Sequence, residues 1–172
     1  MGDSIDKYYD RLKMDTAQPI RYQEYLKEVQ IKDPEGFKSG VAWYGTSTTP
    51  GRIVRIKLKY NDPSRVFFDR LLKEFKIRFG KPTGWRGDCF GIFIAWKWSF
   101  KDAGGNRVSM ILQHNIKDPK QKMGNNIKLT MWDFIDNERR IHEQKQERKK
   151  EKPAVIKPKD IKPEEWERFI PK

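Results

Sequence analysis

Residues 90–114 read FGIFIAWKWSFKDAGGNRVSMILQH, and this stretch decides the fold. Large apolar residues occupy every second position of its first half: Phe90, Ile92, Ile94, Trp96, Trp98 and Phe100. Because side chains alternate between the two faces of a strand, all six lie on one side of an extended chain. Gly104-Gly105-Asn106 can supply the positive φ angles that a tight connection needs. The stretch therefore predicts a long antiparallel hairpin with one buried face.

The residues around this hairpin predict the rest of a sheet domain. Alternating apolar residues indicate further strands at residues 41–46, 52–60 and 127–132. Between them, Asn61-Asp62-Pro63 opens a helix that Gly80 ends, and its apolar stripe is Phe68, Leu71, Leu72, Phe75 and Phe79. We therefore expect an α+β fold, in which a five-stranded, mainly antiparallel sheet has the order strand-strand-helix-strand-strand-strand. The central helix packs on one face of that sheet.

The two ends of the chain have different patterns. Apolar residues recur at helical spacing twice before residue 40, in the sets Ile5, Tyr8, Tyr9, Leu12 and Tyr22, Tyr25, Leu26, Val29. After residue 135 a charged helix is expected, followed by a tail in which Lys-Pro recurs every five residues. The predicted parts are an N-terminal helical segment at 1–39, an α+β core domain at 40–135, and a charged C-terminal helix with a Pro-punctuated tail at 136–172.

The charge of the chain favours an acidic partner. Lys and Arg number 37 against 24 Asp and Glu, which gives a formal net charge of +13. Residues 41–100, inside the predicted core domain, carry 12 basic against 4 acidic residues. A basic excess in the folded part indicates nucleic acid, an anionic membrane surface or an acidic protein as partner. The charge does not choose among the three.

Signatures of catalysis are missing from the sequence. Cys89 is the single cysteine, which excludes an intrachain disulfide and a thiolate-rich zinc site. His114 and His142 have no neighbours at metal-ligand spacing, and no nucleophile lies beside a base. We therefore expect no catalytic residues, metal or cofactor, and a binding protein rather than an enzyme. The sequence contains no run of about 18 apolar residues, so it predicts no membrane-spanning helix.

One side of the predicted sheet is basic. If the apolar sides pack on the helix, the opposite side carries cations interleaved with Phe93, Ile111 and Trp132; the cations are Arg55, Lys57, Lys59, Lys97, Arg107 and Lys128. Cations among flat rings can contact phosphates and stack on bases. The same charges could simply solvate the sheet, or could pair with Glu138, Glu143, Glu147 and Glu151 of the C-terminal helix.

These patterns predict a non-catalytic interaction module that engages an acidic or protein partner. Its contact surfaces are the basic sheet face, the loop pair Trp85-Arg86, and an aromatic C-terminal segment with Trp166, Phe169 and Ile170. The alternative is a protein that binds RNA or single-stranded DNA through the basic face. A second alternative is an enzyme with a site around Trp85–Cys89 and His114. The sequence does not give the oligomeric state. It also leaves two compartments open: the protein is either cytoplasmic or an exported bacterial protein whose signal peptide has been removed.

Overall fold

The computed structural model describes residues 1–48, 51–87, 92–116 and 124–151. The chain forms two compact units, Met1–His142 and Glu143–Lys172. The whole sheet belongs to the first unit. The described part of the second unit is the distal portion of helix α2, which spans Trp132–Glu151.

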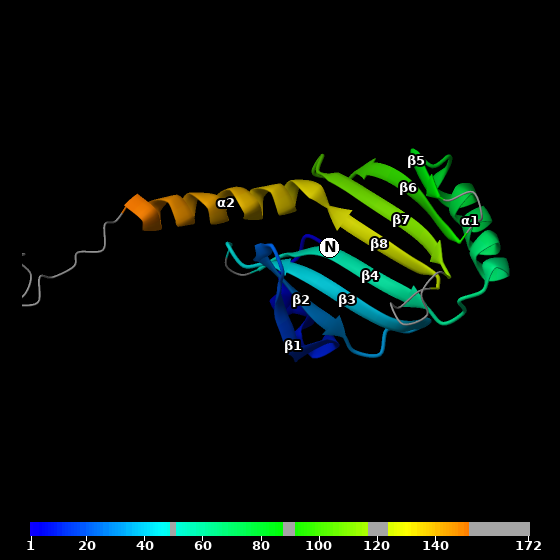
Figure 1. Cartoon of the computed structure of the whole chain (residues 1–172), viewed down its shortest axis with the longest axis horizontal. Helices are drawn as coiled ribbons and strands as arrows, with labels where there is room; N and C mark the ends of the chain where they lie inside the picture. Colours follow the sequence, from blue (N-terminus) through cyan, green and yellow to red (C-terminus); the bar gives the residue numbers. More distant parts are fainter. Residues whose placement is uncertain (49–50, 88–91, 117–123, 152–172) are drawn as a thin grey trace, which may run out of the picture. The chain divides into compact units, whose positions relative to one another are not determined.

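The described residues form one eight-stranded antiparallel sheet in the order β1-β2-β3-β4-β8-β7-β6-β5 (Figure 1). Two four-stranded meanders meet where β4 pairs with β8, and helix α1 (Arg65–Phe79) connects them along the chain. The strands are β1 Leu12–Ile20, β2 Gln23–Ile31, β3 Phe37–Gly45, β4 Ile53–Tyr60, β5 Gly84–Gly87, β6 Phe93–Lys101, β7 Arg107–Asn115 and β8 Asn126–Met131.

The predicted α+β class is confirmed, but the prediction of a five-stranded sheet is wrong. Two of the three additional strands, β1 and β2, replace most of the expected N-terminal helices; only η1 (Ile5–Arg11) is helical, as a 3-10 helix. The third is β5, in a segment expected to be a loop. The predicted hairpin is present as β6 and β7.

The helical spacing in the N-terminal segment is misleading because β2 is covered on both faces. Leu26 is fully buried against Val54 and Ile135, whereas Val29 is buried in a separate cluster with Leu12. A strand with apolar contacts on both sides shows no alternation of polar and apolar residues. Tyr22, the first member of the apparent helical set, is 84% exposed in the turn between β1 and β2.

Helix α1 packs on one side of the second meander, as the sequence predicts. The Ser64 hydroxyl caps the helix by accepting a hydrogen bond from the Phe67 amide at 3.2 Å, and the helix ends at Gly80, whose φ is +76°. The Trp98 indole donates to the Gly80 carbonyl at 2.9 Å. Phe68 is fully buried at the centre of the cluster, whose other buried members are Ile94, Trp98, Met110, Leu112 and Ile127. We call this side of the sheet the core face.

The first turns of α2 cover one end of the other side. Ile135 packs against Leu26 and Val54, and the Glu138 carboxylate is buried at 2% exposure. The sequence left open that Glu138 pairs with a cation of the sheet, but the structure gives its carboxylate other partners. Instead it accepts hydrogen bonds from the amides of Ser47 at 2.7 Å and Thr48 at 3.2 Å, and from the Thr48 hydroxyl. The carboxylate therefore joins α2 to the connection that follows β3.

Replacing Glu138 by Ala should lower the free energy of unfolding by about 2–4 kcal/mol, because two amide donors lose their acceptor in a buried place. Urea unfolding followed by circular dichroism measures this change. Glu143→Ala, at an exposed position of α2, is the matched control and should change stability little. Equal effects of the two substitutions would contradict the role given to Glu138.

Candidate functional site

Strand register places the predicted sheet cations on one side of the sheet. Lys57 of β4 lies directly opposite Lys128 of β8, Lys128 opposite Ile111 of β7, and Ile111 opposite Lys97 of β6. These four residues form one row across four strands, away from the core face. Neighbouring strands are about 4.8 Å apart, so the row spans about 14 Å. We call this side the basic face.

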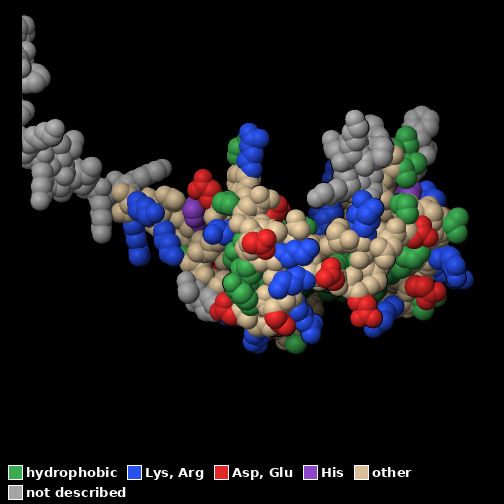
Figure 2. Space-filling view, turned by 90° about the horizontal axis from the view of Figure 1, so that it is seen from below, with side chains coloured by type: hydrophobic (Ala, Val, Ile, Leu, Met, Phe, Trp, Pro, Cys, Tyr) green, Lys and Arg blue, Asp and Glu red, His purple; other side chains and the backbone are tan. Residues whose placement is uncertain are grey.

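Carboxylates are missing from strands β3 to β8, whereas β2 adds Glu28 to this side of the sheet, opposite Trp43. Strands β3 to β8 contain no Asp or Glu, whereas each of the six contains at least one Lys or Arg. Figure 2 shows one side of the molecule, on which Lys and Arg side chains are interleaved with Asp and Glu. Charges of both signs are the usual way to keep a surface soluble. The strands depart from that rule.

Three cations lie close together at the centre of the basic face. Arg55 is two residues before Lys57 on β4, and its Nε donates to the Thr130 hydroxyl of β8 at 3.3 Å. The Arg55 guanidinium also lies 5.6 Å from the centre of the Trp43 ring. These contacts orient Arg55 along the same side of the sheet as Lys57 and Lys128.

Burial disfavours the charged forms of two of these groups, Lys128 and Arg55. The pKa of Lys128 is lowered, first by burial and then by the charges of Arg55 and Lys57. Burial also lowers the pKa of Arg55, while Tyr25 acts in the opposite direction. The fold therefore holds Arg55 and Lys128 in a poorly hydrated place, and the charges of Arg55 and Lys57 add to the effect of burial on Lys128.

Two hollows lie beside this cationic centre. The larger, of about 790 Å³, is lined mainly from β2, β3, β4 and β8. Its walls include Trp43, Lys57, Lys59 and Asn126, and also the acidic residues Glu28 and Asp33. A second, of about 470 Å³, lies over β6 and β7 beside the first residue of α2, Trp132. Trp132 is 39% exposed, and its indole donates to the Ser109 hydroxyl at 2.8 Å. A partly exposed aromatic ring is therefore held in place next to the basic row.

The other predicted contact residues have different surroundings. Arg107 forms ion pairs with Asp133 at 2.6 Å and Asp136 at 2.8 Å, so its charge is balanced by α2. Trp85 is 54% exposed on edge strand β5, with its ring 6.2 Å from that of Trp96 on the core-face side. Arg86 is exposed on the same strand. The remaining predicted residues lie outside the described part of the chain: Cys89, Trp166, Phe169 and Ile170.

Sequence reasoning missed Trp43 and Thr130 as members of the basic face. Trp43 is opposite Arg55 on the β3 side, and Thr130 is opposite Arg55 on the β8 side. Strands β3 and β4 were both expected, but nothing in the sequence gives the register in which they pair. Counting alternate positions outward from Arg55 after assuming a β3–β4 hairpin would have found Trp43.

His114 is enclosed by the fold. It is 1% exposed, lies 5.3 Å from the Phe68 ring, and makes a 2.8 Å hydrogen bond between Nδ1 and the Asn125 side-chain oxygen. The Asn125 amide donates to the carbonyls of Asp62 and Ser64, so its oxygen is the acceptor and His114 Nδ1 the donor. The network ties the start of α1 to the sheet. This enclosure argues against His114 as a catalytic base.

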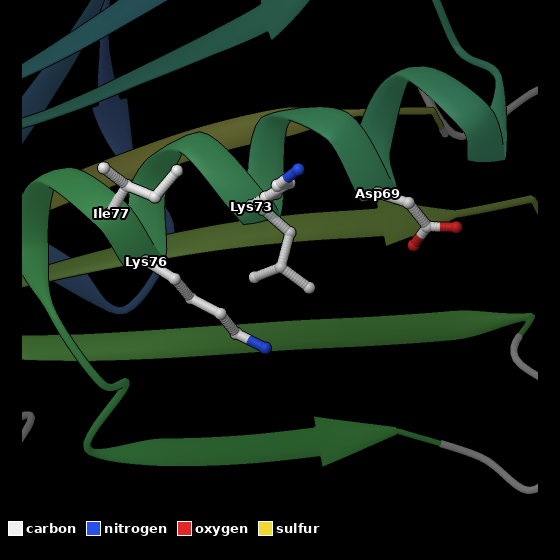
Figure 3. A pocket seen from close by; sticks show the side chains of 5 residues that line it. Asp69, Lys73, Lys76 and Ile77 are labelled. Carbon is white, nitrogen blue, oxygen red and sulfur yellow. The ribbon is translucent and has the colours of Figure 1, made fainter.

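A shallow depression on α1 offers no chemistry. Its volume is about 370 Å³, and Figure 3 shows Asp69, Lys73, Lys76 and Ile77 projecting from this single helix. Among the described residues, no three His, Cys, Asp or Glu side chains group as metal ligands would. In the same part of the chain, every helix is too short or too polar to cross a bilayer.

Comparisons with protein-family models, with curated proteins and with solved structures found no match for this chain. The candidate site therefore rests on its own geometry and charge.

Removing the charge of Lys128 should stabilise the protein. Lys128→Met should raise the free energy of unfolding by about 0.5–1 kcal/mol near neutral pH, because a like-charge pair across two strands is lost. Lys97→Met, at an exposed position opposite Ile111, should have a smaller effect.

The stabilisation should depend on pH. Because the pKa of Lys128 is lower in the folded than in the unfolded chain, its protonation destabilises the fold below that pKa. The wild-type protein gains stability as pH rises through the lowered pKa toward 10.5, and its difference from Lys128→Met should shrink. Urea unfolding across this range measures both; a constant difference would contradict the assignment.

Proposed function

We propose that this protein binds an acidic partner on the basic face of its sheet, and that single-stranded nucleic acid is the partner this face fits best. The observation that carries the proposal is the row from Lys97 to Lys57, built on strands without a single carboxylate. A polyanion would gain from every cation in the row and meet no acidic strand residue from β3 to β8.

Nucleic acid fits better than an acidic protein segment because the face offers more than charge. Trp132, held by Ser109 beside the row, presents a flat surface on which a base can stack. Gln113 of β7 lies on the same side of the sheet and is partly exposed, whereas Ser109, Asn126 and Thr130 are buried. The Gln113 amide can donate to and accept from the edges of unpaired bases. A single strand exposes those edges.

An acidic protein remains the competing partner in this proposal. It would neutralise the same cations, and the aromatic segment with Trp166, Phe169 and Ile170 would supply a second contact surface. The two classes differ in what they need from Trp132. A carboxylate-rich peptide has no bases to stack on the ring.

Binding of a fluorescein-labelled uridine or thymidine oligonucleotide should be detectable by anisotropy at about 50 mM salt and should weaken steeply as salt increases. Lys57→Gln combined with Lys128→Gln should reduce the salt slope by about 1.4, since each phosphate contact on a single strand contributes about 0.7.

The matched control removes two cations from the outer surface of α1, with Arg70→Gln and Lys73→Gln, and both positions are exposed. This variant has the same net charge and should keep the wild-type slope. Equal slopes in both double variants would show binding by overall charge and would refute the basic face. No binding of the wild-type protein at low salt would remove nucleic acid as the partner.

Trp132→Leu should weaken oligonucleotide binding by about 1–3 kcal/mol, the usual contribution of stacking one base, and leave the salt slope unchanged. Trp85→Leu is the control, because Trp85 is also exposed but lies on the core-face side of edge strand β5. Anisotropy titration of both variants at fixed salt measures the effect. Equal losses would contradict a stacking role for Trp132.

A further inference from the structure

The row of residues through Lys57 and Lys128 continues across both meanders. Register pairs Lys57 with Val41 of β3, which lies opposite Gln30 of β2, and Gln30 lies opposite Lys13 of β1. At the other end, Lys97 of β6 lies opposite Gly84 of β5. We call the whole set the extended row, and from β1 to β5 it consists of Lys13, Gln30, Val41, Lys57, Lys128, Ile111, Lys97 and Gly84.

The extended row crosses all eight strands without an acidic residue. Its cations Lys13 and Lys97 are exposed near the two ends, and Lys128 is half-buried at the centre. None of these three forms an ion pair with another described residue. Lys57 has an interaction of its own within the chain, so the cations of the row that are open to a ligand are Lys13, Lys97 and Lys128.

Local structure holds Lys13 at its place in the row. Strand β1 is irregular between Lys13 and Gln18. The Thr16 hydroxyl, inside this irregular stretch, donates to the Lys13 carbonyl at 2.6 Å and accepts from the Gln30 amide at 3.0 Å. Thr16 therefore ties Lys13 to Gln30, and the exposed side chains of this pair continue the basic face to the edge of the sheet.

The start of α2 closes one of the two paths that a long ligand could take over this face. A path along β4 runs toward Arg55, where burial already lowers the pKa of the guanidinium. Beyond Arg55, Ile135 of α2 packs against Leu26 and Val54, so the first turns of α2 occupy that end of the strands. The extended row passes through Lys57, two residues further from this contact, and crosses the strands instead of following them.

Two acidic residues lie beside the extended row in the first meander. Glu28 is two residues from Gln30 along β2, about 7 Å away, and accepts a hydrogen bond from the Gln18 amide at 2.8 Å. Asp33 is exposed in the turn after β2, and both carboxylates line the larger hollow. A polyanion that crosses β2 must pass near Glu28, whereas one that stays on the second meander does not meet it.

We infer that single-stranded nucleic acid lies across the strands of the sheet, along the extended row, so that its phosphates reach Lys13 on edge strand β1 as well as Lys97 on β6. The inference rests on the proposed function and deepens it, because it gives the direction of the ligand and adds the first meander to the binding surface. Six strand spacings of about 4.8 Å separate β1 from β6, or about 29 Å. A stacked strand covers this distance with about nine phosphates, at about 3.4 Å each.

The test uses the full chain and a fluorescein-labelled thymidine oligonucleotide of about 12 nucleotides, long enough for the whole row. Anisotropy titrations at several salt concentrations give the salt slope. Lys13→Gln and Lys97→Gln should each reduce the slope by about 0.7, and the double variant by about 1.4. Glu28→Gln keeps an acceptor for Gln18 and should tighten binding about two- to fivefold at low salt, because a like charge beside the ligand is removed.

Two control variants have the same net charge as the single lysine variants. Lys101→Gln changes an exposed cation on the same strand and the same side as Lys97, four residues away from the extended row, where its charge already acts on Asp133. Arg21→Gln changes an exposed cation in the turn between β1 and β2. Both variants should keep the wild-type slope.

The outcomes separate this inference from the proposed function. A wild-type slope for Lys13→Gln together with a reduced slope for Lys97→Gln would overturn the crossing path and leave the proposed function standing. Equal reductions in the two lysine variants and the two controls would show binding by overall charge and would refute both. Absence of oligonucleotide binding by the wild-type protein at low salt would also refute both.

Discussion

The pairing of β4 with β8 is the constraint on which the rest of the structure depends. Each meander could pair its own strands through short connections, but only this central pair joins the two into one sheet. The register of that pair also decides which residues share a face. With Leu58 opposite Ile127 and Ile56 opposite Leu129, the apolar residues of both strands face the same way, and Lys57 and Lys128 necessarily face the other. A shift by one residue would place a lysine opposite an apolar residue and expose half of the core.

Buried polar groups hold the helices at the two ends of this arrangement. Asn125, immediately before β8, binds the carbonyls of Asp62 and Ser64 and so fixes where α1 begins. Glu138, in the second turn of α2, binds the amides after β3. Both contacts join segments at least 60 residues apart in sequence. Because buried polar groups require their partners, they favour one placement of each helix over nearby ones. The core face and the basic face therefore stay distinct.

The sequence predicts the part of the fold in which one face of each strand is apolar and the other polar. The hairpin at residues 93–115, the strand with Lys57, and α1 with Phe68 all follow from alternation or helical spacing. The first two strands, β1 and β2, were not predictable in this way. Strand β2 buries Leu26 on one side and Val29 on the other, and the helical spacing that results is accidental. Edge strand β5 has four residues, too few for any periodicity.

The candidate site, too, could be predicted from the sequence only in part. The common side of Arg55, Lys57, Lys97 and Lys128 could be predicted, because each lies between apolar residues of its own strand. Their proximity could not, since it depends on which strands pair and in what register. The same limit applies to Arg107, whose charge is balanced by two aspartates of a helix. Trp43 joins the site only through its place opposite Arg55.

The placement of Lys57 opposite Lys128 carries a cost that a fold under selection for stability alone would not keep. Replacing either residue by a neutral one of similar length would leave the core face untouched, since neither side chain contributes to it. The β-sheet around the pair is well formed, with five register pairs between β4 and β8, so the repulsion is tolerated and is not a consequence of poor pairing. Local destabilisation of this kind, held in place by a stable scaffold, is a common feature of binding sites, and it is one of the observations behind the proposal of an acidic partner.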